Sequence, residues 1–166
     1  MYKRQGVPWE DTGGATDTGM IAILFGSGSG LLPSNSEAIT QNSVVSSTNE
    51  DGDRFGYSLA TGDFDRDGYD DLAVGVPYED TGGANDTGMV AILFGSNAGL
   101  LPSNTEAITQ NSVVSTTNET GDRFAFSLAT GDLDGDGYDD LAVGVPYEDT
   151  DGTDACLLYT SPSPRD

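Results

Sequence analysis

The sequence predicts an all-β fold. Its 166 residues include 23 glycines and 7 prolines, a composition that favours many short strands and turns over long helices. Apolar residues recur with the period of a strand in several short segments, and no segment keeps the period of a helix. A unit of 69 residues also returns along the chain, which indicates that one piece of structure is built more than once.

The repeat is clearest in a GVP motif. This motif begins at Gly6, returns at Gly75 and returns again at Gly144, so successive copies stand 69 residues apart. A period of this length holds a complete supersecondary unit. Other segments return in the same register: GMIAILFGS of 19–27 corresponds to GMVAILFGS of 88–96, AITQNSVVS of 38–46 to 107–115, and GDRFGYSLATGD of 52–63 to GDRFAFSLATGD of 121–132.

Within one repeat, four strands are expected. Large and small residues alternate over 55–60 and again over 72–76, which predicts strands that keep their large residues on one face. The segment 89–94 is apolar on both faces, as in a buried strand, whereas 106–114 mixes polar and apolar residues, as in an outer strand. Four antiparallel strands repeated at a long fixed period are typical of the blades of a β-propeller.

An acidic loop lies between the first and second strands. Carboxylates occupy positions 1, 3, 5 and 9 of the segment that begins at Asp63, and Gly68 at position 6 permits a sharp turn. Carboxylates this close repel one another by on the order of 1 kcal/mol unless a cation binds them. An all-oxygen set of this kind suits Ca²⁺. The expected ligands are the side chains of Asp63, Asp65, Asp67 and Asp71 with the backbone carbonyl of Tyr69, and in the next repeat the side chains of Asp132, Asp134, Asp136 and Asp140 with the carbonyl of Tyr138.

Other interpretations of the acidic loops are weaker. An EF-hand loop begins in the same way, but it needs an acid at position 12 and flanking helices, and here Val74 and Val143 stand at position 12 within apolar strands. Acids that merely decorate a solvated turn would have no reason to keep identical spacing in two copies. Asp70 and Asp139, at position 8, are expected to be solvated turn residues, with metal ligation as the alternative.

These motifs resemble the FG-GAP repeats of the integrin α-subunit β-propeller and its bacterial relatives. Phe55 and Gly56 stand for the FG and the motif at Gly75 stands for the GAP, with the acidic loop between them. The resemblance covers about residues 6–154. The second copy departs from it because Ala125 follows the phenylalanine, and every GAP site carries valine in the middle.

The resemblance implies a calcium-stabilised propeller segment of a secreted or cell-surface protein. Its expected role is adhesion, in which propeller loops would bind an unknown protein or glycan ligand. Its other partners would be the remaining blades of the parent propeller. The alternative is a non-catalytic accessory propeller of a secreted enzyme. An isolated arc of such a ring exposes strand edges and apolar faces, so the fragment is expected to be marginally stable or prone to aggregation.

One complete blade flanked by two half blades is therefore expected. Both ends of the chain differ from the repeat in composition and are interpreted as non-native sequencing scars, so the single cysteine, Cys156, is left out of the fold. The expected organisation is a scar at 1–5, the end of a first repeat at 6–53, a complete repeat at 54–122, the start of a third at 123–154, and a second scar at 155–166.

Composition argues against several other functions. The formal net charge of −22 disfavours nucleic acid and anionic membranes as partners, since both are polyanions. No apolar stretch is long enough to insert into a membrane. The chain has no histidine and no cysteine outside the suspected scar, and the serine in GSGSG of 26–30 lacks a partner base, so no enzymatic activity is expected.

An aromatic residue and an acidic, glycine-rich loop follow each GVP motif. The loops 8–19 and 77–88 are expected to be hairpin connections on the face opposite the acidic loops, which the resemblance makes the ligand face. Trp9, Tyr78 and Tyr147 recur there, and they are expected to pack between blades, with ligand recognition as the alternative. The bases Arg54 and Arg123 are expected to form salt bridges with neighbouring acids, or else to contact a ligand.

Overall fold

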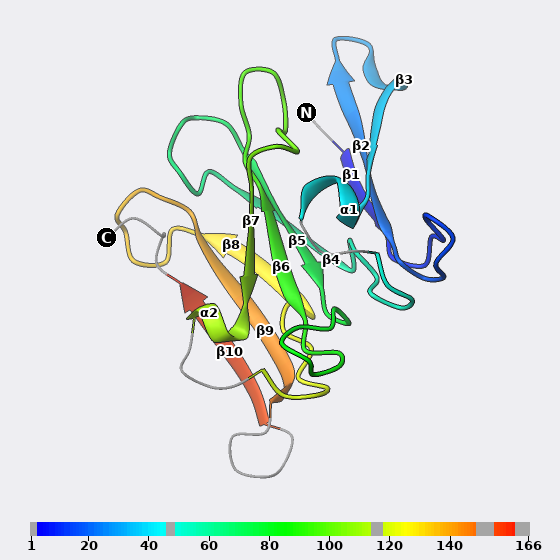
Figure 1. The fold of residues 1–166 in the computed structure, drawn as a ribbon. Helices are drawn as coiled ribbons and strands as arrows, with labels where there is room; N and C mark the ends of the chain where they lie inside the picture. Colours follow the sequence, from blue (N-terminus) through cyan, green and yellow to red (C-terminus); the bar gives the residue numbers. More distant parts are fainter. Residues whose placement is uncertain (1–2, 46–48, 114–117, 149–154, 162–166) are drawn as a thin grey trace.

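The computed structural model describes residues 3–45, 49–113, 118–148 and 155–161, and it shows three antiparallel sheets arranged as an arc (Figure 1). The all-β prediction is confirmed. The first sheet has the order β1-β2-β3, the second β4-β5-β6-β7 and the third β10-β9-β8. The strands are β1 (Lys3–Val7), β2 (Met20–Ser27), β3 (Gly30–Ile39), β4 (Ser58–Gly62), β5 (Asp71–Val76), β6 (Met89–Leu93), β7 (Thr105–Thr109), β8 (Ser127–Gly131), β9 (Asp140–Glu148) and β10 (Ala155–Ser161).

The central sheet is the four-stranded antiparallel blade that the repeat predicts. Its first strand begins at Ser58 and not at Phe55, because the amide of Phe55 bonds to the carbonyl of Thr18, in the loop that leads into β2 of the first sheet. The last strand ends at Thr109 and is followed by the single-turn helix α2 (Gln110–Val113), so the expected outer strand is shorter than 106–114. A matching helix, α1 (Gln41–Val44), follows β3, and both helices are too short to show a helical period in the sequence.

Each flanking sheet has three strands where two were expected. Lys3 to Gln5 form part of β1, which pairs with β2, and the C-terminal segment forms β10, which pairs with β9. Strand pairing uses backbone groups, so an edge can accept a segment that is unrelated to the repeat. The pairing is thus compatible with the interpretation of both ends as non-native, which stays a prediction.

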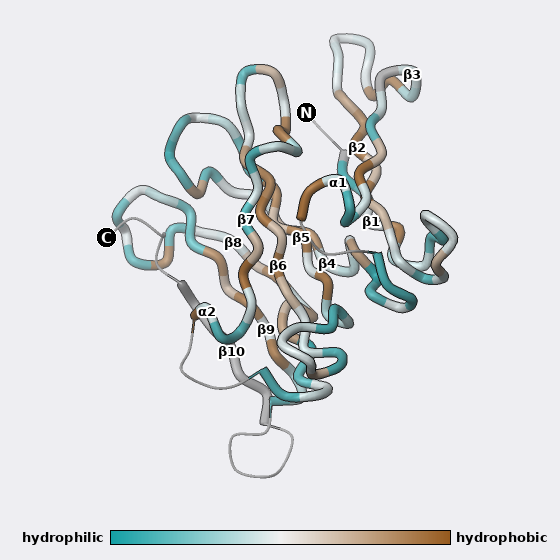
Figure 2. The backbone as a smooth tube through the Cα atoms, viewed as in Figure 1, coloured by the Kyte–Doolittle hydropathy of each residue, from teal (hydrophilic) through white to brown (hydrophobic). Residues whose placement is uncertain are grey.

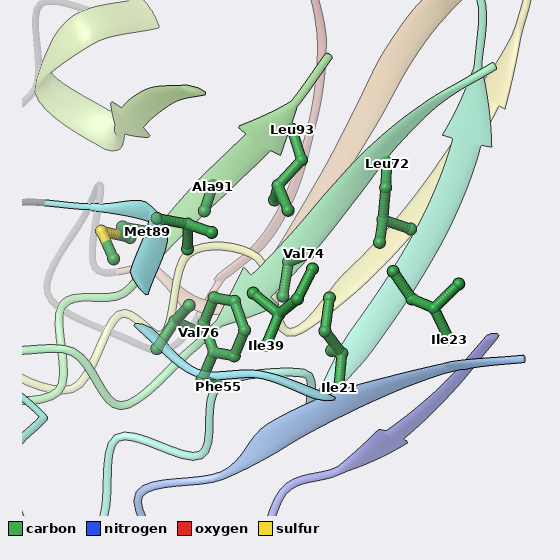
Figure 3. Close-up of a cluster of buried hydrophobic side chains, with 11 residues drawn as sticks. Ile21, Ile23, Ile39, Phe55, Leu72, Val74, Val76, Met89, Ala91 and Leu93 are labelled. Carbon is green, nitrogen blue, oxygen red and sulfur yellow. The ribbon is translucent and has the colours of Figure 1, made fainter. Parts of the chain in front are cut away.

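Two apolar clusters hold the arc together, one on each face of the central sheet. In β5 the large residues Leu72, Val74 and Val76 face the first cluster, and Ala73 faces the second, as the alternation predicts. Figure 3 shows the first cluster, in which this strand and Phe55 meet isoleucines from the first sheet. Hydropathy along the backbone has the same pattern, with apolar residues along the strands and polar residues in the loops (Figure 2).

The strand β6 is buried on both faces, as its sequence predicts. Met89, Ala91 and Leu93 belong to the first cluster, whereas Val90 and Ile92 belong to the second. All five residues are at most 4% exposed. One face of β6 packs toward the first sheet and the other toward the third, so β6 links all three sheets. Full burial of each large aliphatic side chain contributes roughly 1.5–3 kcal/mol to this packing.

The FG and GAP motifs meet at the contacts between sheets. A Cβ atom on Gly6 would overlap the carbonyl oxygen of Gly56, and one on Gly75 would lie 2.5 Å from the carbonyl oxygen of Ala125. Glycine is therefore required where a strand of one sheet meets the FG turn of the next. Gly56 itself has φ +85°, and Ala125 adopts φ +69° at the corresponding place while fully buried.

Candidate metal-binding loops and the opposite loop face

Two acidic loops lie at the same end of neighbouring sheets (Figure 1). The first acidic loop, residues 63–71, leads from β4 into β5, and the second acidic loop, residues 132–140, leads from β8 into β9. Each loop follows a strand that ends in glycine and precedes the strand that carries the GVP motif. The repeat therefore places two equivalent clusters of carboxylates on adjacent blades.

Backbone amides fold the first acidic loop around its own carboxylates. The side chain of Asp63 accepts hydrogen bonds from the amides of Asp67 and Gly68, each at 3.0 Å. Asp71, at the far end of the loop, accepts the amide of Phe64 at 2.9 Å through Oδ2. These bonds direct the carboxylate oxygens toward one another, which costs repulsion in the absence of a counter-charge.

The second acidic loop repeats this pattern. Asp132 accepts the amides of Asp136 and Gly137, each at 3.1 Å, and Asp140 accepts the amide of Leu133 at 2.7 Å. The backbone at position 4 is left-handed in both loops, at φ +57° in Arg66 and φ +83° in Gly135, with glycine at position 6 also at positive φ. Identical spacing thus gives the same pattern of backbone hydrogen bonds and the same left-handed positions.

Each loop brings three of its four predicted carboxylates together. Oxygen atoms within 4.8 Å of one another come from Asp63, Asp65 and Asp71 in the first loop, and from Asp132, Asp134 and Asp136 in the second. Asp67 and Asp140 therefore stand outside these groups. The two tyrosines lie at the turn as expected, where the amide of Tyr69 bonds to Asp67 at 2.9 Å and that of Tyr138 bonds to Asp136 at 2.8 Å.

Burial and neighbouring charges raise the pKa values of two aspartates in the loops, Asp71 and Asp134. Burial raises the pKa of Asp71, although the amides of Gly95 and Phe64 act in the opposite direction, and the charges of Asp65 and Asp67 raise it further. For Asp134 the amide of Asp136 lowers the pKa, but desolvation and the surrounding carboxylates together outweigh it and raise the value. A cation between these groups would stabilise their charged forms.

The donor set fits a hard divalent cation. All candidate ligands are oxygen atoms, as Ca²⁺ and Mg²⁺ prefer, and the described residues place no histidine or thiolate beside them. In addition, Oδ1 of Asp140 is buried and accepts no hydrogen bond within the described part of the chain. The corresponding oxygen of Asp71 accepts the amide of Gly95 at 2.7 Å. An acceptor of this kind at the ligand position gains a partner when a cation binds.

Position 8 of the loops behaves differently in the two copies. Asp70 is exposed, as expected of a solvated turn residue. Asp139 is half-buried, and its Oδ2 accepts the amide of Asp63 in the preceding blade at 2.9 Å. The expectation for Asp139 therefore needs correction, because a neighbouring blade supplies a hydrogen-bond donor that the local sequence does not reveal.

Arginines stack between aromatic rings on the opposite loop face. The Cζ atom of Arg54 lies 5.7 Å from the ring centroid of Trp9 and 4.2 Å from that of Tyr78. Arg123 in turn lies 4.9 Å from Tyr78 and 4.7 Å from Tyr147. Each arginine thus lies between the aromatic residues of two successive GVP motifs, where cation–π attraction joins the blades.

This stacking decides between the interpretations of these residues. The expected salt bridges to Arg54 and Arg123 are not present among the described residues, and both Nε atoms are buried without a hydrogen-bond partner there. The aromatic residues pack between blades, as expected, and Tyr57 and Phe126 extend the aromatic contacts at a centroid distance of 4.9 Å. Guanidinium groups that already lie between rings have a structural role without any ligand.

The glycine-rich loops are hairpin connections, as the sequence predicts. In the loop 77–88, Asp80 accepts the amide of Asp86 at 2.8 Å and Thr87 accepts the amide of Thr81 at 3.2 Å. Asn118, from the segment that leads into the next blade, donates to the hydroxyl of Thr81. The acids and threonines of the loop therefore satisfy backbone and side-chain groups within the fold.

A buried polar network between blades was not anticipated from the sequence. Gln41 of α1 donates to Glu79 at 2.5 Å and to Asp53 at 3.3 Å, and all three side chains are at most 4% exposed. Gln110 donates to Glu148 in the same way one repeat later. Burial raises the pKa of Asp53 to about 6. The only signal in the sequence is the return of these polar residues in register.

Helices that could cross a membrane are not found within the described residues. Comparison with known proteins gives a clear result. The FG-GAP repeat model matches residues 55–93 and 124–155, which begin at the two phenylalanines of the repeat.

Several known proteins are similar to the chain. Integrin alpha-PS2 of Drosophila melanogaster is 38% identical over 113 residues, which cover 65% of this chain and 8% of the relative. Integrin alpha-8 of Mus musculus is 35% identical over 116 residues, covering 67% and 10%. Phosphatidylinositol-glycan-specific phospholipase D of Rattus norvegicus is 36% identical over 93 residues, covering 56% and 11%. The chain thus spans about a tenth of the length of these relatives.

Proposed function

Because the chain carries FG-GAP repeats similar to those of integrin α subunits, we propose that it is a calcium-stabilised β-propeller segment of a secreted or cell-surface protein. The segment packs against the remaining blades of its parent propeller. It acts in adhesion by binding a protein or glycan ligand through its loops. The observation that carries the proposal is the pair of acidic loops, each of which gathers three carboxylates within 4.8 Å.

Calcium suits these loops better than a smaller ion. Ca²⁺ accepts six to eight oxygen ligands at about 2.3–2.6 Å in flexible geometry, and a nine-residue loop offers carboxylates, a backbone carbonyl and room for water. The proposed ligands are the aspartates at positions 1, 3, 5 and 9 and the tyrosine carbonyl at position 7. Sites of extracellular modules bind at roughly 10⁻⁴ to 10⁻³ M, which matches the calcium concentration outside cells.

The proposed role in ligand binding is supported by the loop face opposite the acidic loops. The arginine and aromatic stack joins the blades on the opposite face, and the glycine-rich loops there are fixed by internal hydrogen bonds. Such a face is a rigid platform on which loops can present a recognition surface. Similarity to integrin α subunits supports a role at the cell surface.

The alternative role, as a non-catalytic accessory propeller of a secreted enzyme, has narrower support. It rests on the similarity to phosphatidylinositol-glycan-specific phospholipase D, which covers 56% of the chain, against 67% for integrin alpha-8. We therefore place adhesion first.

Isothermal titration calorimetry of the full chain tests the calcium sites. The proposal expects two sites, one of which disappears in Asp65→Ala and the other in Asp134→Ala. Asp70→Ala is the matched control, because it removes the same charge from an exposed position and should retain both sites. The absence of calcium binding by the parent chain, or full binding by both loop variants, would contradict the proposal.

A further inference from the structure

The two acidic loops contact each other across the boundary between blades. The amide of Asp63 donates to Oδ2 of Asp139 at 2.9 Å, and the amide of Asp139 donates to the carbonyl oxygen of Asp63 at 3.3 Å. One residue of the second loop therefore holds both backbone polar groups of the residue that opens the first loop. Asp139 itself lies between Tyr138 and Asp140, which stand at two proposed ligand positions of the second loop.

A second contact runs in the other direction, from Arg66 of the first loop. Its Nη1 donates to the carbonyl oxygen of Asp136 at 3.4 Å, and its Cζ lies 5.3 Å from the ring centroid of Tyr138. A Cβ atom on Gly137 would lie 3.2 Å from the guanidinium carbon, so glycine at this position leaves room for the arginine. The second loop has Gly135 at the place of Arg66 and cannot make such a contact from its own position 4.

The contacts alternate with the ligand positions along the second loop. Asp136, Tyr138 and Asp140 are proposed ligands. The groups that hold the first loop are the carbonyl of Asp136, the ring of Tyr138, and the carboxylate and amide of Asp139. A cation that orders this segment would also order the groups that position Asp63. The first loop would then lose less conformational freedom when it binds its own ion.

We propose that calcium binding at the two acidic loops is positively cooperative, and that Asp139 and Arg66 transmit the coupling between blades. This inference rests on the proposed function, since it concerns the same calcium sites. Coupling of this kind is reciprocal, so each loop must strengthen binding at the other by the same factor.

Electrostatics acts in the opposite direction. An ion on one loop weakens the negative field that attracts a second ion to the other. At about 0.15 M ionic strength this field decays over about 8 Å, whereas hydrogen bonds in direct contact are screened much less. The experiment therefore belongs at physiological salt, where the repulsion opposes the cooperative effect less than at low salt.

The test is calcium titration by calorimetry of the full chain and of two single-site variants. Asp65→Ala leaves only the second loop and Asp134→Ala leaves only the first. We expect each remaining site to bind about five- to tenfold more weakly than it does when the other loop is occupied, within the usual range of allosteric coupling. The two factors should agree, as reciprocity requires.

Two further variants identify the contacts. Asp139→Ala, combined with each single-site variant, should bring the coupling factor to about one. Asp70→Ala should leave the factor unchanged, because Asp70 has the same charge at the same loop position but makes no hydrogen bond to another blade in the described part of the chain. Circular dichroism checks that each variant keeps its strands. Where Asp139→Ala does not fold, Arg66→Asn decides, because asparagine tolerates the positive φ of that position and removes the guanidinium contacts.

The outcomes separate the two proposals. If the parent chain binds no calcium, the proposed function fails. If it binds two ions independently, the calcium proposal stands and the coupling proposal is overturned. Equal loss of coupling in the Asp139 and Asp70 variants would also overturn it, since charge and not contact would then be responsible.

Discussion

A methyl group added to Gly56 tests how tightly the FG turn fits between blades. Gly56 adopts φ +85°, and a Cβ atom there would lie 2.8 Å from Cγ2 of Ile21 and 2.9 Å from the carbonyl oxygen of Met20. The Gly56→Ala variant therefore combines a left-handed backbone with a clash inside the interface. Gly83 has the same φ of +85° with nothing within 4 Å of its Cβ position, which makes Gly83→Ala a matched control.

The two substitutions should differ by the clash alone. A left-handed alanine costs about 1–2 kcal/mol, and the lower entropy of the unfolded chain returns about 0.4–1 kcal/mol of this. Gly83→Ala should thus lower the free energy of unfolding by about 0–1.6 kcal/mol. Overpacking adds about 1–3 kcal/mol at Gly56, for a total loss of about 1–4.6 kcal/mol.

Thermal unfolding followed by circular dichroism measures this difference. At roughly 2–4 °C per kcal/mol for a domain of this size, Gly56→Ala should lower Tm by about 2–18 °C and Gly83→Ala by at most about 6 °C, with Gly56→Ala the larger of the two by the contribution of the clash. Equal losses in the two variants would refute the argument that the FG glycine is required by the neighbouring blade.

Two other predictions concern the opposite loop face and the buried network. Arg54→Lys should lower Tm by roughly 2–4 °C and change the fluorescence of Trp9, the only tryptophan, because lysine lacks the planar group that stacks between two rings, whereas Arg66→Lys should leave the fluorescence unchanged. Asp53, whose pKa rises from 3.8 to about 6 on folding, binds a proton in the folded state before the unfolded chain does, so stability in EDTA should increase as the pH falls from 7 to 4. Asp53→Asn should remove that part of the pH dependence. If thermal unfolding of this variant has the same pH dependence as that of the parent chain, protonation of Asp53 is not its cause.

The architecture was predictable wherever local pattern and burial agree. The alternation of large and small residues predicts the two faces of β5. The apolar residues on both faces of β6 predict a strand that is buried between neighbouring sheets, as the structure shows. The start of the first strand was not predictable, because Phe55 has the residue type and spacing of a strand residue but its amide bonds to Thr18, in a loop of the neighbouring blade. The single-turn helices α1 and α2 are too short to leave a period in the sequence.

The candidate site was predictable as a motif but not in its contacts between blades. Spacing alone located the carboxylates of both acidic loops, and the structure gathers three in each. The partner of Asp139 lies 76 residues earlier in the chain and that of Gln41 lies 38 residues later, so no local pattern relates them. The sequence predicts salt bridges for Arg54 and Arg123, whereas the fold places each of them against one aromatic ring of its own blade and one of the preceding blade, which no local pattern relates to it.

The central claim is that calcium in the acidic loops stabilises the propeller segment. Its most direct test is the thermal unfolding of the full chain in EDTA and in calcium, alongside the double variant Asp65→Ala, Asp134→Ala. At a hundredfold excess over Kd each site adds about 2.7 kcal/mol, so Tm should rise by roughly 10–20 °C in the parent chain and stay unchanged in the double variant. The same Tm with and without calcium in the parent chain, or an equal rise in the double variant, would contradict the claim.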